Sequence, residues 1–535
     1  MAEKRRNVLL QGGILAGAGI ITKVIGFAYR LPMGNMMGEE GNGLYSVAFG
    51  IYGIALTISS YSLPLAVSKM ISARLAKGEY QNMRRVLANA LVYALIAGLL
   101  AMNVLYFGAG VLEQLYNRPG IEKPLRVLAP TTFIVALLGV FRGYFQGHGE
   151  MISTSVSQIL EQIVNAVVSV FATWQFMRMY SGREDASAYG AAGGTLGTLA
   201  GAFIALIFIM YLFVANHKRY RHRPNPKEQL ESGAQIYKAL FLTIIPVILS
   251  QTIYQIGYTI DDIMFGQLME HKGFTDQVVA SLQGVYNTQY NQLINLPVAI
   301  ATAMAASTLP SIVLSRMQND MRGMHQKITQ VIKVNMVIAF PSAVGLAVLA
   351  EPFMQMLFPS LVTYRPQAVM LLMTGSSAVI FYALSTLTTS ILQGNNYMKL
   401  PVIHSAVSLG IHIVLLGILL AFTDLGVYAL VICNVLFPLV VSALNCRSIG
   451  RNVGYRWEFL NTFIKPFLAS AAMGIVAFAI YQELGSAFHN VYIVSIIAFG
   501  AAVIVYGVVI LQIRCFSEEE LESIPGGKLL SRLIL

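Results

Sequence analysis

Apolar stretches of about 20 residues recur from one end of this sequence to the other, and they restrict its fold more than any other feature. Each is long enough to cross the hydrocarbon core of a bilayer as a helix. Because 56% of the residues are hydrophobic and only 11% are charged, no water-facing surface of ordinary composition accommodates the chain. We therefore expect an all-α integral membrane protein without a soluble domain.

The apolar stretches, bounded by charge, proline and glycine, predict about fourteen transmembrane helices. An even number places both termini on one side of the membrane. With that side cytoplasmic, 27 of the 36 Lys and Arg residues fall on inside segments and 7 on outside segments, which is a strong positive-inside bias. The predicted helices are centred near residues 20, 57, 98, 135, 163, 200, 250, 298, 338, 376, 411, 435, 472 and 500.

Two short sequence echoes indicate an internal repeat. Residues 63–66 (LPLA) recur as 296–299 (LPVA), and residues 146–147 (QG) recur as 393–394. The partners lie six predicted helices apart, so the repeats have the same orientation and form two parallel six-helix lobes, as in alternating-access transporters. The predicted domains are an N-lobe (1–216), a cytoplasmic linker (217–233), a C-lobe (234–447), and two C-terminal helices with a cytoplasmic tail (448–535).

Two cations lie inside the first predicted helix. Lys23 and Arg30 are seven residues apart and therefore within about 20° of one helix face. A charge at membrane depth costs several kcal/mol, so each needs a partner or a water-filled cavity. One interpretation is a structural network with Glu161, Asp261 or Asp262, and the other is a cationic cavity for an anionic head group. The candidate substrate-binding residues are Lys23, Arg30, Lys69 and Arg142.

Acidic residues at membrane depth are equally few. Glu161 and Gln158 belong to a polar stripe in predicted helix five, whereas Asp261 and Asp262 close predicted helix seven. Adjacent residues on a helix point about 100° apart, so the two aspartates cannot both face one site. One of them is a candidate for binding Na⁺ or a proton, and the alternative is structural capping or pairing. No other metal and no cofactor is expected.

Pro64 and Pro297 lie in predicted helices two and eight. They are candidate gating points, because a proline frees a backbone carbonyl and bends a helix, although a purely structural role fits them as well. His404 and His412 are read as packing residues rather than proton relays. The sequence contains no P-loop, HExxH, GxSxG or dinucleotide-binding motif, so we do not expect an enzyme.

Four stretches resemble the MurJ/YtgP-like branch of the MOP superfamily of flippases and multidrug exporters. They are residues 23–30 (KVIGFAYR), 63–69 (LPLAVSK), 141–148 (FRGYFQGH) and 157–164 (SQILEQIV), and RGYFQG is the most specific. The resemblance implies a flippase for undecaprenyl-pyrophosphate-linked sugars, with peptidoglycan lipid II as the leading candidate. It also implies movement from the inner to the outer leaflet of a bacterial cell membrane, and a lipid-tail groove beside the last two helices.

An ungapped alignment matches Lys23 to a basic residue of the MurJ pattern but puts Tyr29, one step before Arg30, at its next arginine. The acidic residue that MurJ carries before helix two has Glu39 and Glu40 as its nearest substitutes. This pattern is similar to the YtgP-like and spore-cortex-type subgroup.

The resemblance implies as partners a lipid-linked oligosaccharide, membrane lipids and cell-wall synthesis proteins, with no nucleic acid, and a monomeric chain. A Na⁺ or H⁺ gradient or the membrane potential is the expected driving force. A rival interpretation is a cation-coupled, MATE-like multidrug exporter, which is expected to place carboxylates rather than Lys23 and Arg30 in its cavity. A membrane scaffold without transport, the third interpretation, has little use for charges at membrane depth.

Overall fold

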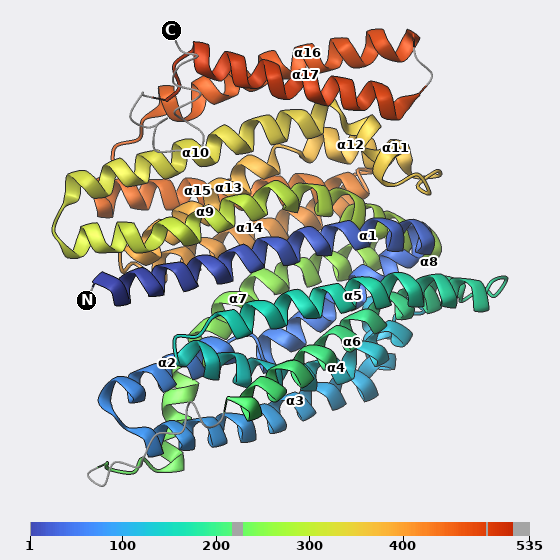
Figure 1. Ribbon diagram of the computed structural model, residues 1–535. Helices are drawn as coiled ribbons and strands as arrows, with labels where there is room; N and C mark the ends of the chain where they lie inside the picture. Colours follow the sequence, from blue (N-terminus) through green and yellow to red (C-terminus); the bar gives the residue numbers. More distant parts are fainter. Residues whose placement is uncertain (1, 217–227, 488–489, 517–535) are drawn as a thin grey trace. The chain divides into compact units, whose positions relative to one another are not determined.

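The computed structural model describes residues 2–216, 228–487 and 490–516, and every regular element in these ranges is helical (Figure 1). The all-α expectation is confirmed. The chain divides into two compact units, Met1–Gly284 and Val285–Leu535. The first contains α1 (Ala2–Ser59), α2 (Leu63–Lys77), α3 (Tyr80–Tyr116), α4 (Glu122–Gly147), α5 (Ile152–Met179), α6 (Ala186–Ala215), α7 (Gly233–His271) and α8 (Asp276–Gly284). The second contains η1 (Val285–Tyr290), α9 (Asn291–Met317), α10 (Met321–Val348), α11 (Ala350–Leu357), α12 (Arg365–Gly375), α13 (Ala378–Gly394), α14 (Lys399–Phe422), α15 (Val427–Val453), η2 (Leu460–Ile464), α16 (Lys465–Ala487) and α17 (Val491–Gln512).

Within these ranges, ten helical segments are long and apolar enough to cross a membrane, or eleven if the bent pair α12 and α13 is one span. The ten treat α1 and α2 as a single segment and do not include α7 and α9. The predicted centres all fall within helices except the one near residue 376, which falls in the break between α12 and α13. The fold with many apolar spans is therefore confirmed, and the number fourteen stays a prediction.

Predicted helix two is built in two pieces. The long helix α1 is bent at Gly38, which has a φ of 71°, and it ends at Ser59. Residues 60–62 separate it from α2, and Pro64 lies in the first turn of α2, where a missing N–H costs no helical hydrogen bond. Pro297 lies in α9, shortly after the π-helical turn η1. Both prolines therefore follow an irregular turn, and their gating role stays a prediction.

Glycines let α5 and α6 pack at close range. A Cβ on Gly193, Gly197 or Gly201 of α6 would lie 2.5–2.7 Å from a carbonyl oxygen of α5. Small residues at four-residue spacing give two membrane helices this close approach, because neither backbone is held away by side chains. This glycine face fixes the position of the polar residues of α5.

We expect Gly197→Ala to destabilise the protein by about 1–3 kcal/mol, because the added methyl overfills a closely packed interface. A Cβ there would lie 2.1 Å from the Ser169 hydroxyl oxygen. The matched control is Gly108→Ala in α3, where no atom lies within 4 Å of the new Cβ. Thermal unfolding in detergent measures both. Equal unfolding temperatures for the two variants would show that the interface tolerates the methyl group.

The segment that leads into α7 is tied to the ends of α2 and α3. The Glu228 carboxylate accepts hydrogen bonds from the backbone N–H groups of Gln81 (2.9 Å) and Asn82 (2.5 Å) at the start of α3. Arg74 of α2 forms a 2.5 Å ion pair with Glu231. A carboxylate at a helix N-terminus satisfies donors that have no intrahelical partner, so these contacts hold the start of α7 against α2 and α3.

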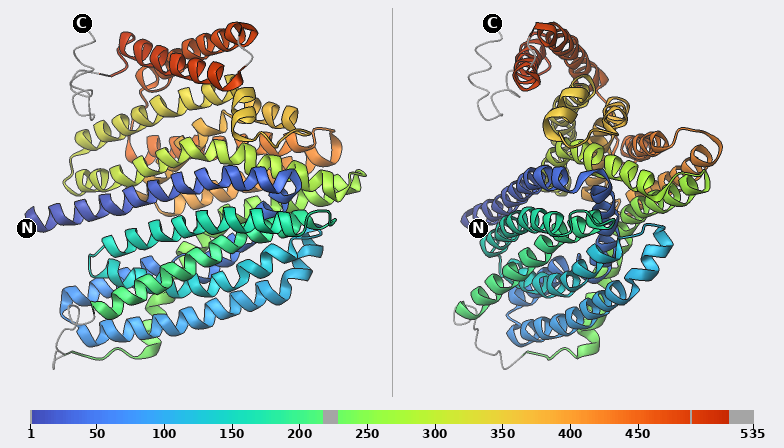
Figure 2. Two further views of the ribbon diagram at one scale, coloured as in Figure 1. Left: turned by 45° about the vertical axis from the view of Figure 1, so that its right-hand side comes forward. Right: turned by 90° about the vertical axis from the view of Figure 1, so that its right-hand side faces the viewer.

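In the second unit, α16 and α17 pair along their length and lie beside α10 (Figure 2). The contact with the end of α10 is apolar, with Leu349 packed against Met473 and Ala477 of α16. These are the last two predicted transmembrane helices. Residues 217–227 of the predicted linker lie outside the described residues, and the division into lobes at 217–233 stays a prediction.

Candidate functional site

Arg30 lies on α1 among aromatic side chains. Its guanidinium lies beside the hydroxyls of Tyr29 and Tyr45, and 5.9 Å from the centre of the Phe49 ring. The Nε atom is buried and has no hydrogen-bond partner. Among the described residues, no carboxylate forms an ion pair with Arg30. The side chain therefore keeps a cationic donor that this part of the protein does not use.

Arg142 of α4 and Glu161 of α5 form an ion pair. The Arg142 Nη2 atom lies 2.7 Å from Glu161 Oε2, and Nε donates to Ser157 Oγ at 2.8 Å. Both side chains are largely buried, with exposed fractions of 12% and 24%. The sequence predicted Arg142 as a substrate-binding cation and Glu161 as a polar or coupling residue. In the structure each neutralises the other, so Glu161 is the partner of Arg142 rather than of Arg30.

Asn165 and two tyrosines of α1 complete this region, and the sequence predicted no functional role for any of them. The Asn165 amide donates to the Tyr29 hydroxyl at 3.3 Å and accepts from Ser169 Oγ at 2.9 Å. Tyr52 of α1 lies near the Glu161 carboxylate. Asn165 follows Glu161 by four residues, and that helical spacing was the available signal. We call the following residues the polar seam: Tyr29, Arg30, Tyr45, Tyr52, Arg142, Ser157, Glu161 and Asn165.

The other predicted cations lie apart from the polar seam. Lys23 is exposed on α1 and Lys69 is exposed on α2, whereas Gln158 is half-buried on α5. Within the described ranges, no hydrogen bond or ion pair joins these three side chains to the seam. Lys23 and Arg30 still share one face of α1 by their spacing. A substrate site built from all four cations stays a prediction, with Arg30 as its best placed member.

Both aspartates of α7 are buried. A Cβ on Gly50 of α1 would lie 3.7 Å from Asp262 Oδ2, and the Asp262 carbonyl accepts a 2.9 Å hydrogen bond from Gln283. The cation Arg118 also lies near the Asp262 carboxylate. No cluster of three or more His, Cys, Asp or Glu side chains suited to a metal occurs in the described part of the chain. The assignment of Asp261 or Asp262 to cation coupling stays a prediction.

The two histidines of α14 join it to α15. His404 Nδ1 lies 2.7 Å from Asn445 Oδ1, and Nε2 lies 3.3 Å from Ser448 Oγ. His412 Nδ1 lies 3.2 Å from the Cys433 carbonyl oxygen. Both side chains are buried, and both ring nitrogens of His404 have partners. These contacts agree with the packing role that the sequence analysis gave them.

A set of long apolar helices with a buried polar seam on three of them is the arrangement of a multi-pass membrane transporter, where polar side chains at membrane depth line or support a pathway. Residues 8–318, more than half of the chain, match the family described as Polysaccharide biosynthesis protein. The chain belongs to this family.

Two proteins of Bacillus subtilis (strain 168) are similar over most of their length. Stage V sporulation protein B is 24% identical over 98% of both chains, and Lipid II flippase MurJ is 26% identical over 89% of both. Among solved structures, Lipid II flippase MurJ in an inward closed conformation has a TM-score of 0.64 over 92% of this chain and 97% of its own. An inward-facing MATE family multidrug transporter of the MOP superfamily has a TM-score of 0.67 over 81% and 94%. At 15% and 16% identity, these two structures show the fold alone.

Proposed function

We propose that the chain is a flippase that moves an undecaprenyl-pyrophosphate-linked sugar precursor, with peptidoglycan lipid II as the leading candidate, from the inner to the outer leaflet by alternating access. The observation that carries this proposal is the placement of Arg30, a cation with an unused buried N–H. A guanidinium donates two parallel hydrogen bonds to a phosphate, which makes it a selective partner for a pyrophosphate head group.

The physical needs of such a cargo fit this chain. The head group is anionic and polar and must be kept from hydrocarbon, whereas the polyprenyl tail can stay in lipid. A cationic side chain on a membrane helix meets the first need, and lowers the cost of moving charge across the bilayer. The similarity to a lipid II flippase over 89% of both chains supports the same substrate class.

A cation-coupled multidrug exporter is the second candidate, and the likeness of fold to MATE transporters favours it. Such an exporter needs a carboxylate that is open to a cationic drug. Glu161 is the carboxylate of the polar seam, and Arg142 neutralises it at 2.7 Å. Arg30 is the charged side chain of the seam that has no ion-pair partner among the described residues. The seam therefore favours an anionic cargo.

The proposal places the protein in a bacterial cell membrane, with both termini cytoplasmic, as the excess of Lys and Arg on inside segments indicates. It acts as a monomer beside cell-wall synthesis proteins. Its energy comes from a Na⁺ or H⁺ gradient or from the membrane potential.

Reconstitution into liposomes tests the function. Fluorescent lipid II on the outer leaflet is followed by loss of quenching, with a fluorescent organic cation as the competing cargo in a parallel assay. The proposal expects lipid II to cross and the organic cation to remain where it is. Movement of the organic cation without lipid II would assign the chain to the exporters instead.

We expect either Asp261→Asn or Asp262→Asn to remove the dependence of transport on a Na⁺ or H⁺ gradient. A carboxylate on a moving helix can bind a cation in one conformation and release it in the other, and an amide cannot. Insertion into the membrane should be unchanged. Transport is measured in liposomes with and without each gradient. If both variants keep full gradient dependence, neither aspartate couples the cation.

A further inference from the structure

A buried arginine lies where α3 passes into α4 and α7 passes into α8. Arg118 is only 1% exposed. Its Nε donates to Gln283 Oε1 at 2.7 Å, and its Nη1 donates to the Asn117 carbonyl oxygen at 2.6 Å. The Nη1 atom also lies 3.6 Å from Glu270 Oε1, while Nη2 is buried without a hydrogen-bond partner. The guanidinium is therefore fixed in place, and it is aimed at the carboxylate of Glu270.

Carboxylates outnumber this cation. Asp276 lies beside both Glu270 and Arg118, and Asp262 is also near Arg118. With all three carboxylates ionised, three negative charges face one positive charge, so like-charge repulsion favours a proton shared by two of them. The other charged or titratable groups that face this cluster, or adjoin it in the chain, are Tyr116 of α3 near Asp262, Glu40 of α1, Glu184 of the α5–α6 connection, and His271 and Lys272 beside Glu270.

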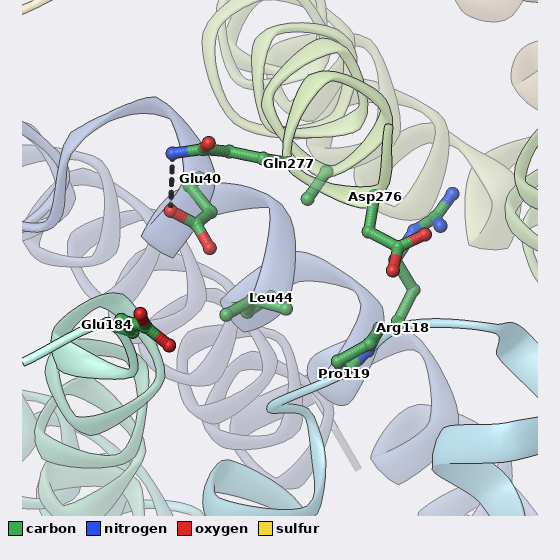
Figure 3. Close-up of a pocket in the computed structure, with 8 residues that line it drawn as sticks. Glu40, Leu44, Arg118, Pro119, Glu184, Asp276 and Gln277 are labelled. Atoms are coloured by element: carbon green, nitrogen blue, oxygen red, sulfur yellow. Dashed lines mark hydrogen bonds between the residues drawn. The ribbon is translucent and has the colours of Figure 1, made fainter. Parts of the chain in front are cut away.

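A cavity of about 390 Å³, lined in part by Arg118 and Asp276, gives this side of the cluster access to water. Figure 3 shows Asp276 beside Arg118 on one wall, and Glu40 joined to Gln277 by a hydrogen bond on another. Glu184 lies on a third side of the cavity (Figure 3). In the predicted topology, the α3–α4 connection and the α7–α8 turn face the outside. Protons from the outer solution can therefore reach this cluster without crossing hydrocarbon.

We propose that Glu270 and Asp276 form a proton-binding site that, when loaded, holds the α7–α8 turn against the α3–α4 connection. In the loaded state the protonated carboxyl donates to its neighbour, and the one remaining negative charge of the pair faces Arg118. In the empty state two adjacent carboxylates repel each other across the turn. The site lies at the predicted outer end of the first unit and is separate from the polar seam. We call the pair Glu270 and Asp276 the latch.

The acidity of Glu270 agrees with this role. Burial, with the hydrogen bond and the negative charge of Asp276 acting in the same direction and Arg118 opposing them, raises the pKa of Glu270 from 4.5 to about 7. The folded protein thus keeps a proton that the unfolded chain releases near pH 4.5. The stabilisation from this proton is full below that pH, and is lost as the pH rises through about 7.

Pulsed electron paramagnetic resonance tests the latch on the full chain in lipid nanodiscs. Spin labels are placed on Gln114→Cys at the end of α3 and Thr275→Cys in the α7–α8 turn, both exposed, after the three native cysteines are replaced by alanine. We expect the distance between labels to lengthen as the pH is raised from about 5.5 to about 8.5, with a midpoint near the pKa of Glu270. Glu270→Gln should keep the short distance at every pH, and Glu184→Gln, in the same cavity, should behave as wild type.

Other outcomes overturn the proposal. A wild-type distance that is constant over this pH range, or a Glu270→Gln variant that keeps the full response, removes the pair as the proton site. If Glu270→Gln does not fold, Asp276→Asn is decisive, because without the second carboxylate no repulsion remains and the distance should stay short at every pH. An equal response to Na⁺ at fixed pH assigns the site to a metal cation instead. No substrate is needed, so this test can fail without touching the proposed flippase function.

Discussion

Replacing Arg30 by glutamine is expected to abolish translocation of the lipid-linked substrate while the amount of folded protein stays near that of wild type. The reason is that Arg30 carries a positive charge without an ion-pair partner among the described residues. It lies beside tyrosine hydroxyls and an aromatic ring and has no carboxylate ion pair in the described part of the chain, so its removal leaves no buried carboxylate unpaired. Loss of a charge-assisted phosphate contact removes about 1.5–3 kcal/mol per hydrogen bond, or about 10- to 100-fold in binding.

Arg30→Lys is expected to be impaired as well, because an ammonium group cannot make the bidentate contact of a guanidinium. Arg178→Gln, which removes an exposed arginine from the end of α5, is the matched control and should transport as wild type. Transport of fluorescent lipid II in liposomes and fluorescence-detected size-exclusion chromatography measure the two effects. If Arg30→Gln instead lowers folded protein and transport in proportion, the residue serves the structure.

Breaking the ion pair of the polar seam should instead lower the amount of folded protein. We expect Arg142→Gln or Glu161→Gln to destabilise the protein by about 3–5 kcal/mol, because either change leaves a largely buried charge without its partner. The double variant Arg142→Gln with Glu161→Gln should recover most of this loss, since no unpaired charge remains. Thermal unfolding in detergent and the yield of folded protein are the measurements.

The chain offers a matched control in the pair Glu122 and Arg126, which lie one turn apart on α4 and are exposed by 33% and 52%. Breaking that pair should cost less than about 1 kcal/mol, because water solvates both charges. Equal losses for the two pairs would mean that Arg142 and Glu161 are solvated in the folded protein. In that case the seam would be open to water at this point.

The sequence predicted the helices well because their cause is local. A run of apolar residues long enough to cross a bilayer can be read without knowledge of its neighbours, and so can the glycine spacing of Gly193, Gly197 and Gly201. A Cβ on Gly201 would lie 2.5 Å from the Glu161 carbonyl oxygen, which shows that this glycine face is packed against α5.

The partners of the charged residues were less accessible to sequence reasoning. Arg142 and Glu161 are 19 residues apart on two helices, and helical periodicity relates only residues on the same helix. Arg118 is one of the seven basic residues on predicted outside segments, yet it is buried against α7 and α8. Whether a connection lies in water or beneath another segment depends on contacts far along the chain, which no local pattern records.

The proposed function depends on binding of the pyrophosphate of a lipid-linked sugar by the Arg30 guanidinium. Native mass spectrometry of lipid II binding, on purified wild-type and Arg30→Gln proteins with matched unfolding temperatures, tests it most directly. We expect an affinity at least about tenfold weaker for Arg30→Gln, which corresponds to about 1.4 kcal/mol, and wild-type affinity for Arg178→Gln. Unchanged lipid II affinity in a well-folded Arg30→Gln sample would contradict it.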